Sequence, residues 1–291
     1  MIKKLFAFLV VLCLFLGCSK DLHVQIPSYI QIDSYKTKVS GTQGTSNQNF
    51  TDMLVYANGQ TYGTYPLGAK IPVLTSGPTS FIVRGVVRMN GLDILRADYE
   101  VMKGCDTVIN VTPGEVTHVV PVFEYFSTAQ FTWIDGFEGG GLADSCNGGT
   151  SCGTLVASYT GHNETATTYS PGFGGKGYCL ALRPNDTIYA SVHSGNAFGL
   201  PAGGVGVYLE LNYQSNVIIQ VYISADGGVT QTDCGGIYPS ATWAKMYMNL
   251  TEQVSTLRSQ SGYTIYFVAS YDGNSSDQAL IDNIKIVTAA P

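Results

Sequence analysis

Side chains that could carry acid–base or nucleophilic catalysis are few and widely spaced in this 291-residue chain. A serine or cysteine nucleophile needs a histidine held by a carboxylate, yet His118, His162 and His193 stand in no G-x-S-x-G, H-E-x-x-H or cysteine-protease context. Glycoside hydrolysis needs two facing carboxylates, and Glu210, in a strand-like segment, is the acid to follow. The sequence therefore predicts a protein that is not an enzyme, with a glycan hydrolase as the least favoured alternative.

Three segments of the C-terminal half alternate aliphatic residues with aromatic or polar ones, as β-strands do. They cover 205–213, 217–224 and 243–250. If these strands share one sheet, the second set of residues forms an aromatic and polar platform: Tyr208, Glu210, Asn212, Gln220, Tyr222, Trp243 and Tyr247. Rings stack on the C–H patches of sugars while amides and carboxylates hydrogen-bond to hydroxyls, so the platform predicts a glycan-binding face. The alternative is a solvated face with ordinary cross-strand pairs.

Cysteine usage fits an oxidising compartment, where an odd number of cysteines leaves at least one unpaired. The predicted pairs and the predicted free thiol are Cys146 with Cys152, Cys179 with Cys234, and Cys105. The first pair encloses a short glycine-rich loop that can close into a small ring. Four zinc ligands at close spacing are not found, so no zinc site is expected.

The elements that would position these residues are strands almost throughout, broken by glycine, asparagine or proline every eight to twelve residues or so. This pattern predicts an all-β protein with a small Ig-like β-sandwich over 29–124 and a larger β-domain over 131–291. The clearest hairpin joins 53–57 to 60–65 through Asn58 and Gly59, because Asn-Gly readily takes the positive φ angles of a type I′ turn.

The hairpin residues 55–60 (VYANGQ), with 63–67 (GTYPL), resemble PEGA-type and carboxypeptidase-regulatory-like surface modules. This resemblance covers a short part of the chain. It implies a β-sandwich for the first domain and does not imply a specific ligand.

Both ends of the second domain resemble those of jelly-roll modules such as MAM domains, family 4-like carbohydrate-binding modules and Bacteroidetes adhesin domains. The matching residues are 135–139 (DGFEG) and 279–286 (ALIDNIKI). The resemblance implies a jelly roll whose first and last strands lie side by side. It also implies a structural calcium ion held by Glu138 and Asp282, since that hard cation requires oxygen ligands. Otherwise Glu138 is an exposed turn residue and Asp282 a polar break in a strand.

A short basic and apolar segment begins the chain, with Lys3 and Lys4 before an apolar run over 5–16. The run is too short to span a bilayer comfortably and predicts a removable secretory signal. Its end at Gly17-Cys18 resembles a bacterial lipoprotein signal, which implies cleavage after residue 17, acylation of Cys18 and a lipidated tether over 18–28. A plain secreted protein and an uncleaved membrane helix are the alternatives.

Two features bear on the cellular setting. Ser19, directly after Cys18, resembles lipoproteins sorted to the outer membrane, with either leaflet open. Thr107 and Thr187 lie in D-T-apolar triplets that match the O-glycosylation pattern of exported Bacteroidetes proteins.

The net charge of −6 and the lack of lysine and arginine clusters argue against nucleic acid as a partner. These observations predict a lipid-anchored binding or adhesion protein of a Bacteroidetes-like outer membrane, with a glycan as its ligand. The alternative is a structural accessory of an outer-membrane secretion, gliding or fimbrial complex.

Overall fold

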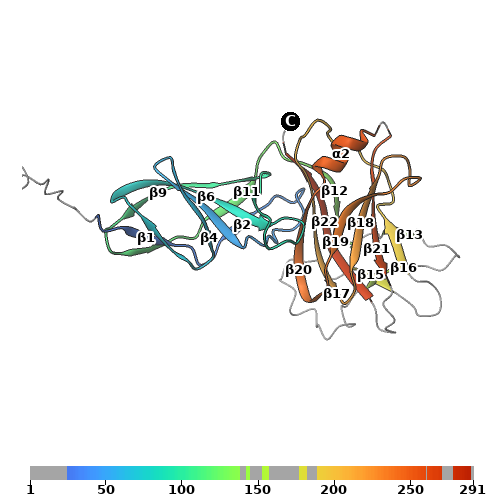
Figure 1. Cartoon of the computed structure of the whole chain (residues 1–291), viewed down its shortest axis with the longest axis horizontal. Coiled ribbons are helices and arrows are strands. Elements are labelled where there is room, and N and C mark those ends of the chain that lie inside the picture. Colours follow the sequence, from blue (N-terminus) through green and yellow to red (C-terminus); the bar gives the residue numbers. More distant parts are fainter. Residues whose placement is uncertain are drawn as a thin grey trace, which may run out of the picture.

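A computed structural model describes residues 25–137, 142–144, 153–156, 177–181, 189–259, 261–270 and 278–289. The predicted residues Cys18, Glu138, Cys146, Cys152 and Thr187 lie outside these ranges. Two β-sandwiches follow one another along an elongated molecule (Figure 1). The predicted all-β fold class is confirmed, because one short helix, α2 (Thr251–Leu257), accompanies the strands of the described ranges. No helix within those ranges is long and apolar enough to cross a membrane.

The first sandwich contains eleven strands. They are β1 (Ser28–Gln31), β2 (Lys36–Lys38), β3 (Asp52–Ala57), β4 (Gln60–Pro66), β5 (Lys70–Val73), β6 (Gly77–Arg88), β7 (Arg96–Asp98), β8 (Met102–Lys103), β9 (Cys105–Val111), β10 (Val116–His118) and β11 (Val122–Tyr125). One sheet has the order β4-β3-β6-β7, with β9 also paired to β6. Two three-stranded sheets, β10-β1-β5 and β2-β11-β8, contribute further apolar residues to its core.

Local sequence explains two details of this sandwich. Asn58 and Gly59 connect β3 to β4 with φ angles of 47° and 77°, so both take the left-handed conformation of the predicted type I′ turn. Gly85, in the middle of β6, lies against the ring of Phe50. A Cβ atom at residue 85 would lie 2.6 Å from that ring, so the close packing requires glycine.

The second sandwich also contains eleven strands among the described residues. They are β12 (Gln130–Asp135), β13 (Ala143–Asp144), β14 (Gly153–Val156), β15 (Gly177–Ala181), β16 (Tyr189–His193), β17 (Val207–Ser215), β18 (Ile219–Ser224), β19 (Thr232–Ile237), β20 (Ser240–Asn249), β21 (Thr264–Ser270) and β22 (Gln278–Thr288). We call β14-β15-β22-β17-β20, with β12 also paired to β22, the domain-facing sheet. We call β13-β16-β21-β18-β19 the open sheet.

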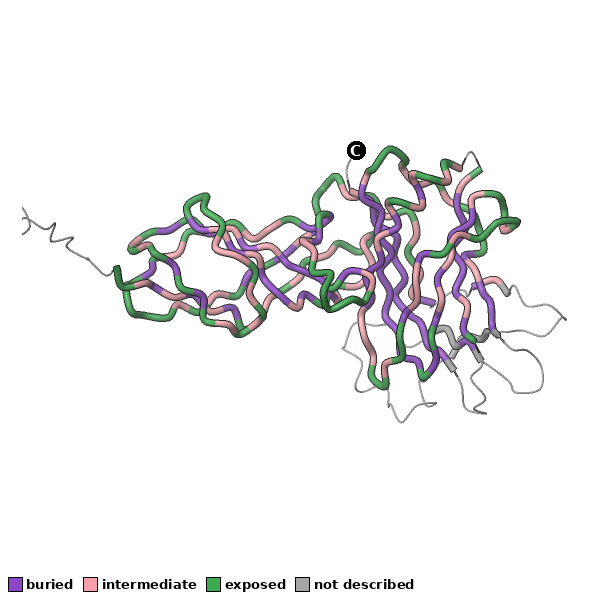
Figure 2. The backbone as a smooth tube through the Cα atoms, in the orientation of Figure 1, coloured by how far each residue is buried: buried purple, intermediate pink, exposed green. Residues whose placement is uncertain are grey.

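An apolar core fills the space between these two sheets, and buried residues run along their central strands (Figure 2). β12 and β22 are antiparallel neighbours, with Asp135 opposite Ile284, so the first and last strands lie side by side as the jelly-roll resemblance implies. Asn283 has a φ angle of 51° where the β22 register shifts against β17. The I-D-N-I segment therefore forms a bulge, which separates Asp282 from Lys285 along the strand.

Candidate functional site

Part of the predicted aromatic and polar platform does share one face of one sheet. β17 pairs with β20 so that Glu210 lies opposite Tyr247, with Asn212 opposite Lys245 one row away. Their alternate neighbours, including Leu211 and Met248, pack in the jelly-roll core. Strand alternation therefore correctly predicted which residues of β17 and β20 point away from that core.

The prediction that this face is open to a glycan is wrong, because the first sandwich covers it. Tyr208, Glu210, Asn212 and Tyr247 are each no more than 3% exposed. Tyr208 and Tyr247 pack within the apolar core of the first sandwich rather than that of the jelly roll. Trp243, near the start of β20, is partly exposed, and these four buried side chains do not join it on an accessible surface.

Glu210 is the centre of a buried polar network between the two sandwiches, which we call the joint. Tyr99 and Tyr125 of the first sandwich each donate a hydrogen bond of 2.7 Å to Glu210 Oε1. Lys245 Nζ lies 2.9 Å and Lys285 Nζ 3.9 Å from Glu210 Oε2. Lys285 also donates to the carbonyl oxygen of Thr45 at 2.6 Å, so its ammonium contacts both sandwiches.

Opposing effects set the protonation of this network. Burial acts to raise the pKa of Glu210, but the charges of Lys245 and Lys285 and a hydrogen bond from Tyr99 outweigh burial and lower it to about 2. Burial lowers the pKa of Lys285 to about 8, with the charge of Lys245 adding to the effect and that of Glu210 opposing it. The carboxylate thus stays ionised at neutral pH between two lysines.

Tyr247, next to Glu210 in the joint, also binds the first sandwich. Its hydroxyl donates to Gln48 Oε1 at 2.8 Å and accepts from the backbone N–H of Asn49 at 2.7 Å. Its carbonyl oxygen accepts from the backbone N–H of Asn90 at 2.7 Å. The ring of Tyr99 packs edge-on against Tyr247, with centroids 5.0 Å apart. These contacts couple the two sandwiches through backbone, side-chain and aromatic interactions together.

The open sheet presents a second aromatic and polar face, on the side of the jelly roll away from the first sandwich (Figure 1). His193, Tyr266, Tyr222 and Asp233 stand opposite one another in register on β16, β21, β18 and β19. The rings of His193 and Tyr266 lie 5.1 Å apart with an interplanar angle of 37°. We call these four residues the open row.

Hydrogen bonds and a nearby turn hold the open row in shape. Asp233 accepts hydrogen bonds from Gln220 Nε2 and from the backbone N–H of Gly235. Gly228 lies so close to the hydroxyl of Tyr266 that an added Cβ would be 2.3 Å from it. Tyr266, in the middle of the row, is buried, while Gln220, Tyr222 and His193 are partly exposed and Asp233 is exposed. Burial, with the charge of Asp226 adding to it, raises the pKa of Tyr266, so its hydroxyl stays protonated.

The structure therefore divides the predicted platform between two sheets. Gln220 and Tyr222 project from β18 of the open sheet, whereas Tyr208, Glu210, Asn212 and Tyr247 belong to the domain-facing sheet. Sequence reasoning missed His193, Tyr266 and Asp233. His193 and Tyr266 carry the same alternation signal, since their neighbours Val192 and Phe267 lie in the core, but only the register shows that they are adjacent.

The predicted disulfide between Cys179 and Cys234 is wrong. Cys234 is a free thiol in the jelly-roll core, where it packs as a small apolar residue. Burial, followed by the charge of Asp233, raises the pKa of the Cys234 thiol to about 12. Cys105 is free, as predicted.

The predicted calcium site and glycosylation sites remain predictions. Asp282 is completely buried on β22, opposite Asn212, and accepts a hydrogen bond of 2.6 Å from the backbone N–H of Asn283. Across the described ranges, no group of three or more histidine, cysteine or acidic residues is arranged to hold a metal ion. Thr107 is partly exposed on β9.

No protein-family model and no curated protein matches the sequence. Among solved structures, a mutant family 29 carbohydrate-binding module complexed with mannohexaose is 14% identical, covering 55% of this chain and 91% of that one at a TM-score of 0.34. A xylan-binding family 22 module from Paenibacillus barcinonensis is 10% identical, with coverages of 57% and 99% and a TM-score of 0.36. An adhesin domain of Lys-gingipain from Porphyromonas gingivalis is 12% identical, with coverages of 55% and 98% and a TM-score of 0.31. At these values the likeness does not extend to a ligand.

Proposed function

We propose that this protein is a lipid-anchored, non-enzymatic binding protein of the bacterial outer membrane that holds a glycan on its open sheet. The observation that carries the proposal is the open row, in which His193, Tyr266, Tyr222 and Asp233 cross four adjacent strands in register. Neighbouring strands lie about 4.8 Å apart, so the row extends about 14 Å. That length suits an oligosaccharide better than a single sugar.

The chemistry of the row suits a sugar ring. The partly exposed rings of Tyr222 and His193 offer faces on which apolar C–H patches can stack. Asp233 and Gln220, already hydrogen-bonded to each other, provide acceptors and an amide donor for hydroxyl groups beside those rings. Because strand pairing fixes the row before any ligand arrives, little ordering would accompany binding.

The rest of the molecule supports presentation of this face. β1, at the start of the described chain, lies towards the end of the first sandwich opposite the joint, and the open sheet lies beyond the joint (Figure 1). The buried contacts of Glu210 and Tyr247 join the two sandwiches without a free linker. An anchor at Cys18 would therefore leave the open row at the end of the molecule away from the membrane, in a set orientation to the first sandwich.

Glycan binding is tested with the protein from Ser19 onward on a glycan array, followed by titration of each hit. We expect Tyr222→Ala to weaken binding about fivefold or more, because one stacked ring contributes on the order of 1 kcal/mol. The matched control is Tyr238→Ala, which removes an exposed ring (62%) outside the row and should leave binding unchanged. An array without hits, or equal effects of the two variants, would contradict the proposal.

The anchor is tested separately in membranes. Acyl chains on Cys18 would retain the mature protein, so Cys18→Ala should move it to the soluble fraction. Detergent-free washing followed by fractionation measures this. Unchanged retention of Cys18→Ala with a normally processed N-terminus would mean that something else anchors the chain.

A specific observation also favours the second candidate function, that of an accessory protein in an outer-membrane complex. The loop between β6 and β7 exposes three aliphatic side chains, and aliphatic groups suit protein contacts better than sugar stacking. This loop borders a cleft between the sandwiches.

A further inference from the structure

A cleft of about 530 Å³ opens where the two sandwiches meet, on the side of the joint that carries α2. The first sandwich lines it with residues from the end of β6 to just beyond β7, and the jelly roll with Gly204, β17, the end of β20 and α2. Three acids line it, namely Asp98, Glu100 and Glu252, and none of its described lining residues is basic. One of these acids, Asp98, is already paired with Arg84 at 2.6 Å.

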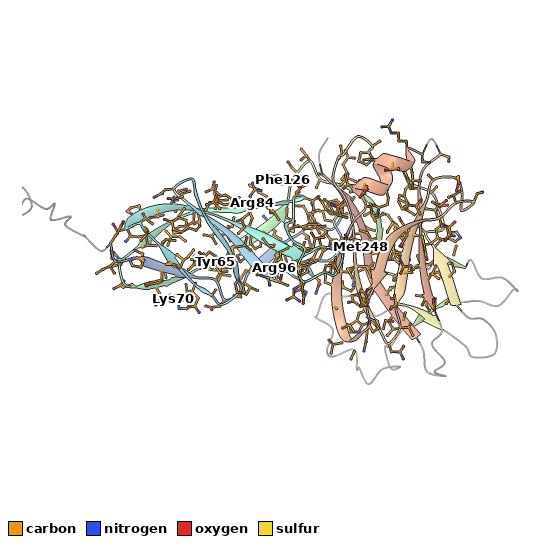
Figure 3. The ribbon with its side chains drawn as sticks, in the orientation of Figure 1. Tyr65, Lys70, Arg84, Arg96, Phe126 and Met248 are labelled. Carbon is orange, nitrogen blue, oxygen red and sulfur yellow. The ribbon has the colours of Figure 1, made fainter. Side chains whose placement is uncertain are left out.

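The two outer acids of this cleft remain available to a ligand. Glu100 and Glu252 are exposed, and they approach the cleft from different sandwiches. Glu100 accepts a hydrogen bond of 2.9 Å from Tyr208, which fixes its carboxylate at the wall. Arg96, near the jelly-roll end of the first sandwich (Figure 3), is paired with Asp52 at 2.9 Å. The cleft is therefore negatively charged on both walls.

An apolar rim borders the cleft. Leu92, Ile94 and Leu95 in the β6–β7 loop are 43%, 93% and 42% exposed. The loop is nonetheless held in shape, because Met89 N–H donates to the carbonyl of Leu95 at 2.8 Å and Arg88 pairs with Asp93 at 2.7 Å. A fixed loop that presents aliphatic groups to water indicates a contact surface.

We propose that this cleft and its rim bind an extended segment of a partner protein that alternates basic and apolar residues. Lysine or arginine side chains would meet Glu100 and Glu252, and the apolar side chains would cover Ile94 and its leucine neighbours. A glycan fits less well, because the rim offers aliphatic groups and the cleft's one ring, Tyr208, is buried. This surface is separate from the open row, so the protein could hold a glycan and a protein partner together.

The test uses the protein from Ser19 onward and two labelled synthetic peptides of equal length, one alternating lysine with leucine and the other glutamate with leucine. Fluorescence anisotropy should show binding of the lysine peptide only, and its affinity should fall with added salt. Ile94→Ser should weaken binding about tenfold, because the peptide would bury the Ile94 side chain that is exposed in the free protein. Glu100→Gln combined with Glu252→Gln should weaken it about fivefold and reduce the salt dependence.

Matched controls locate the effect. Val229→Ser removes a comparably exposed aliphatic group (87%) from the turn between β18 and β19, and Glu124→Gln neutralises a partly exposed acid on β11 that pairs with Lys103; both should leave the affinity unchanged. Glu252→Gln alone changes an exposed residue of α2, so a loss of affinity in this variant would not come from a disturbed joint. Equal binding of both peptides, or equal effects of Ile94→Ser and Val229→Ser, would overturn the proposal. If Ile94→Ser no longer bound a glycan identified on the array, the proposal would also be overturned, because the rim would then be part of a sugar-binding site.

Discussion

The jelly roll has two outer faces that arise from the same alternation of core-facing and outward side chains, yet the molecule uses them differently. On the domain-facing sheet, Glu210 and Tyr247 are sealed beneath the first sandwich. On the open sheet, Tyr222 and His193 stay partly accessible. Outward aromatic and polar residues therefore indicate a surface that contacts something. Whether the contact is a neighbouring domain or a separate ligand depends on what covers the face.

The largest expected difference between the faces comes from Glu210→Ala. Removing the carboxylate leaves Lys245 and Lys285 buried without their counter-charge, which should lower the free energy of unfolding by about 3–5 kcal/mol. Asp233→Ala, on the open sheet, should change it by about 1 kcal/mol or less, because the two hydrogen bonds that Asp233 accepts lie at an exposed site. Urea unfolding followed by tyrosine fluorescence measures both. Equal losses would mean that the joint contributes no more than the open face.

The stabilisation by Glu210 in the joint should also depend on pH. The folded-state pKa of Glu210 is about 2 against an ordinary value of 4.5, so its contribution is present above about pH 4.5 and is lost as the pH falls towards 2. A glutamine at this position has no carboxylate to protonate. The difference in the free energy of unfolding between wild type and Glu210→Gln should therefore narrow by about 3 kcal/mol across that pH range. Unfolding curves at a series of pH values give this gap. A gap independent of pH would show that Glu210 is not held ionised.

Calcium, if the predicted ion binds Asp282, would further stabilise the domain-facing sheet of the jelly roll. An ion absent from the unfolded state stabilises the folded state by about 3 kcal/mol at a hundredfold excess over its Kd. Chelation should then lower the Tm of the whole protein, and Asp282→Asn should remove that response while Asp233→Asn keeps it. A Tm indifferent to chelator and calcium would leave Asp282 as a purely structural buried acid.

Much of the fold could be predicted from the sequence because its causes are local. The Asn58-Gly59 turn is a two-residue signal, and alternation correctly placed Leu211, Met248 and Val221 in the core. What the sequence left open was which strands share a sheet. Only residues 216–218 separate β17 from β18, which in sequence suits a hairpin within one sheet, yet the chain crosses there from the domain-facing sheet to the open sheet.

The site was harder to predict because it depends on contacts between distant residues. Tyr222 lies opposite Tyr266, and His193 comes from a third part of the chain. The joint likewise brings Gln48 to Tyr247, which are 199 positions apart. No local pattern contains such pairings. The same limit explains the wrong disulfide, since the spacing of Cys179 and Cys234 along the chain carries no information about whether the two thiols meet in the fold.

The smallest expected effect is also the most direct comparison, because one substitution is made on each face. Tyr247→Phe deletes a buried hydroxyl between Gln48 and Asn49 and leaves the backbone N–H of Asn49 without that acceptor. It should lower the free energy of unfolding by about 1–2 kcal/mol. Tyr222→Phe deletes a partly exposed hydroxyl, and should change stability by less than about 0.5 kcal/mol.

Ligand binding should respond in the opposite order to this pair of variants. Tyr247 is sealed in the joint, so Tyr247→Phe should leave the affinity for an array-identified glycan unchanged wherever the protein is folded. Tyr222→Phe keeps the stacking ring and loses one hydroxyl, so it should weaken glycan binding by about two- to fivefold, much less than a lost buried contact would. Denaturant midpoints and glycan titrations on the same two preparations complete the comparison. If Tyr247→Phe lowered the affinity for the glycan and Tyr222→Phe lowered the free energy of unfolding, the roles assigned to the two faces would have to be exchanged.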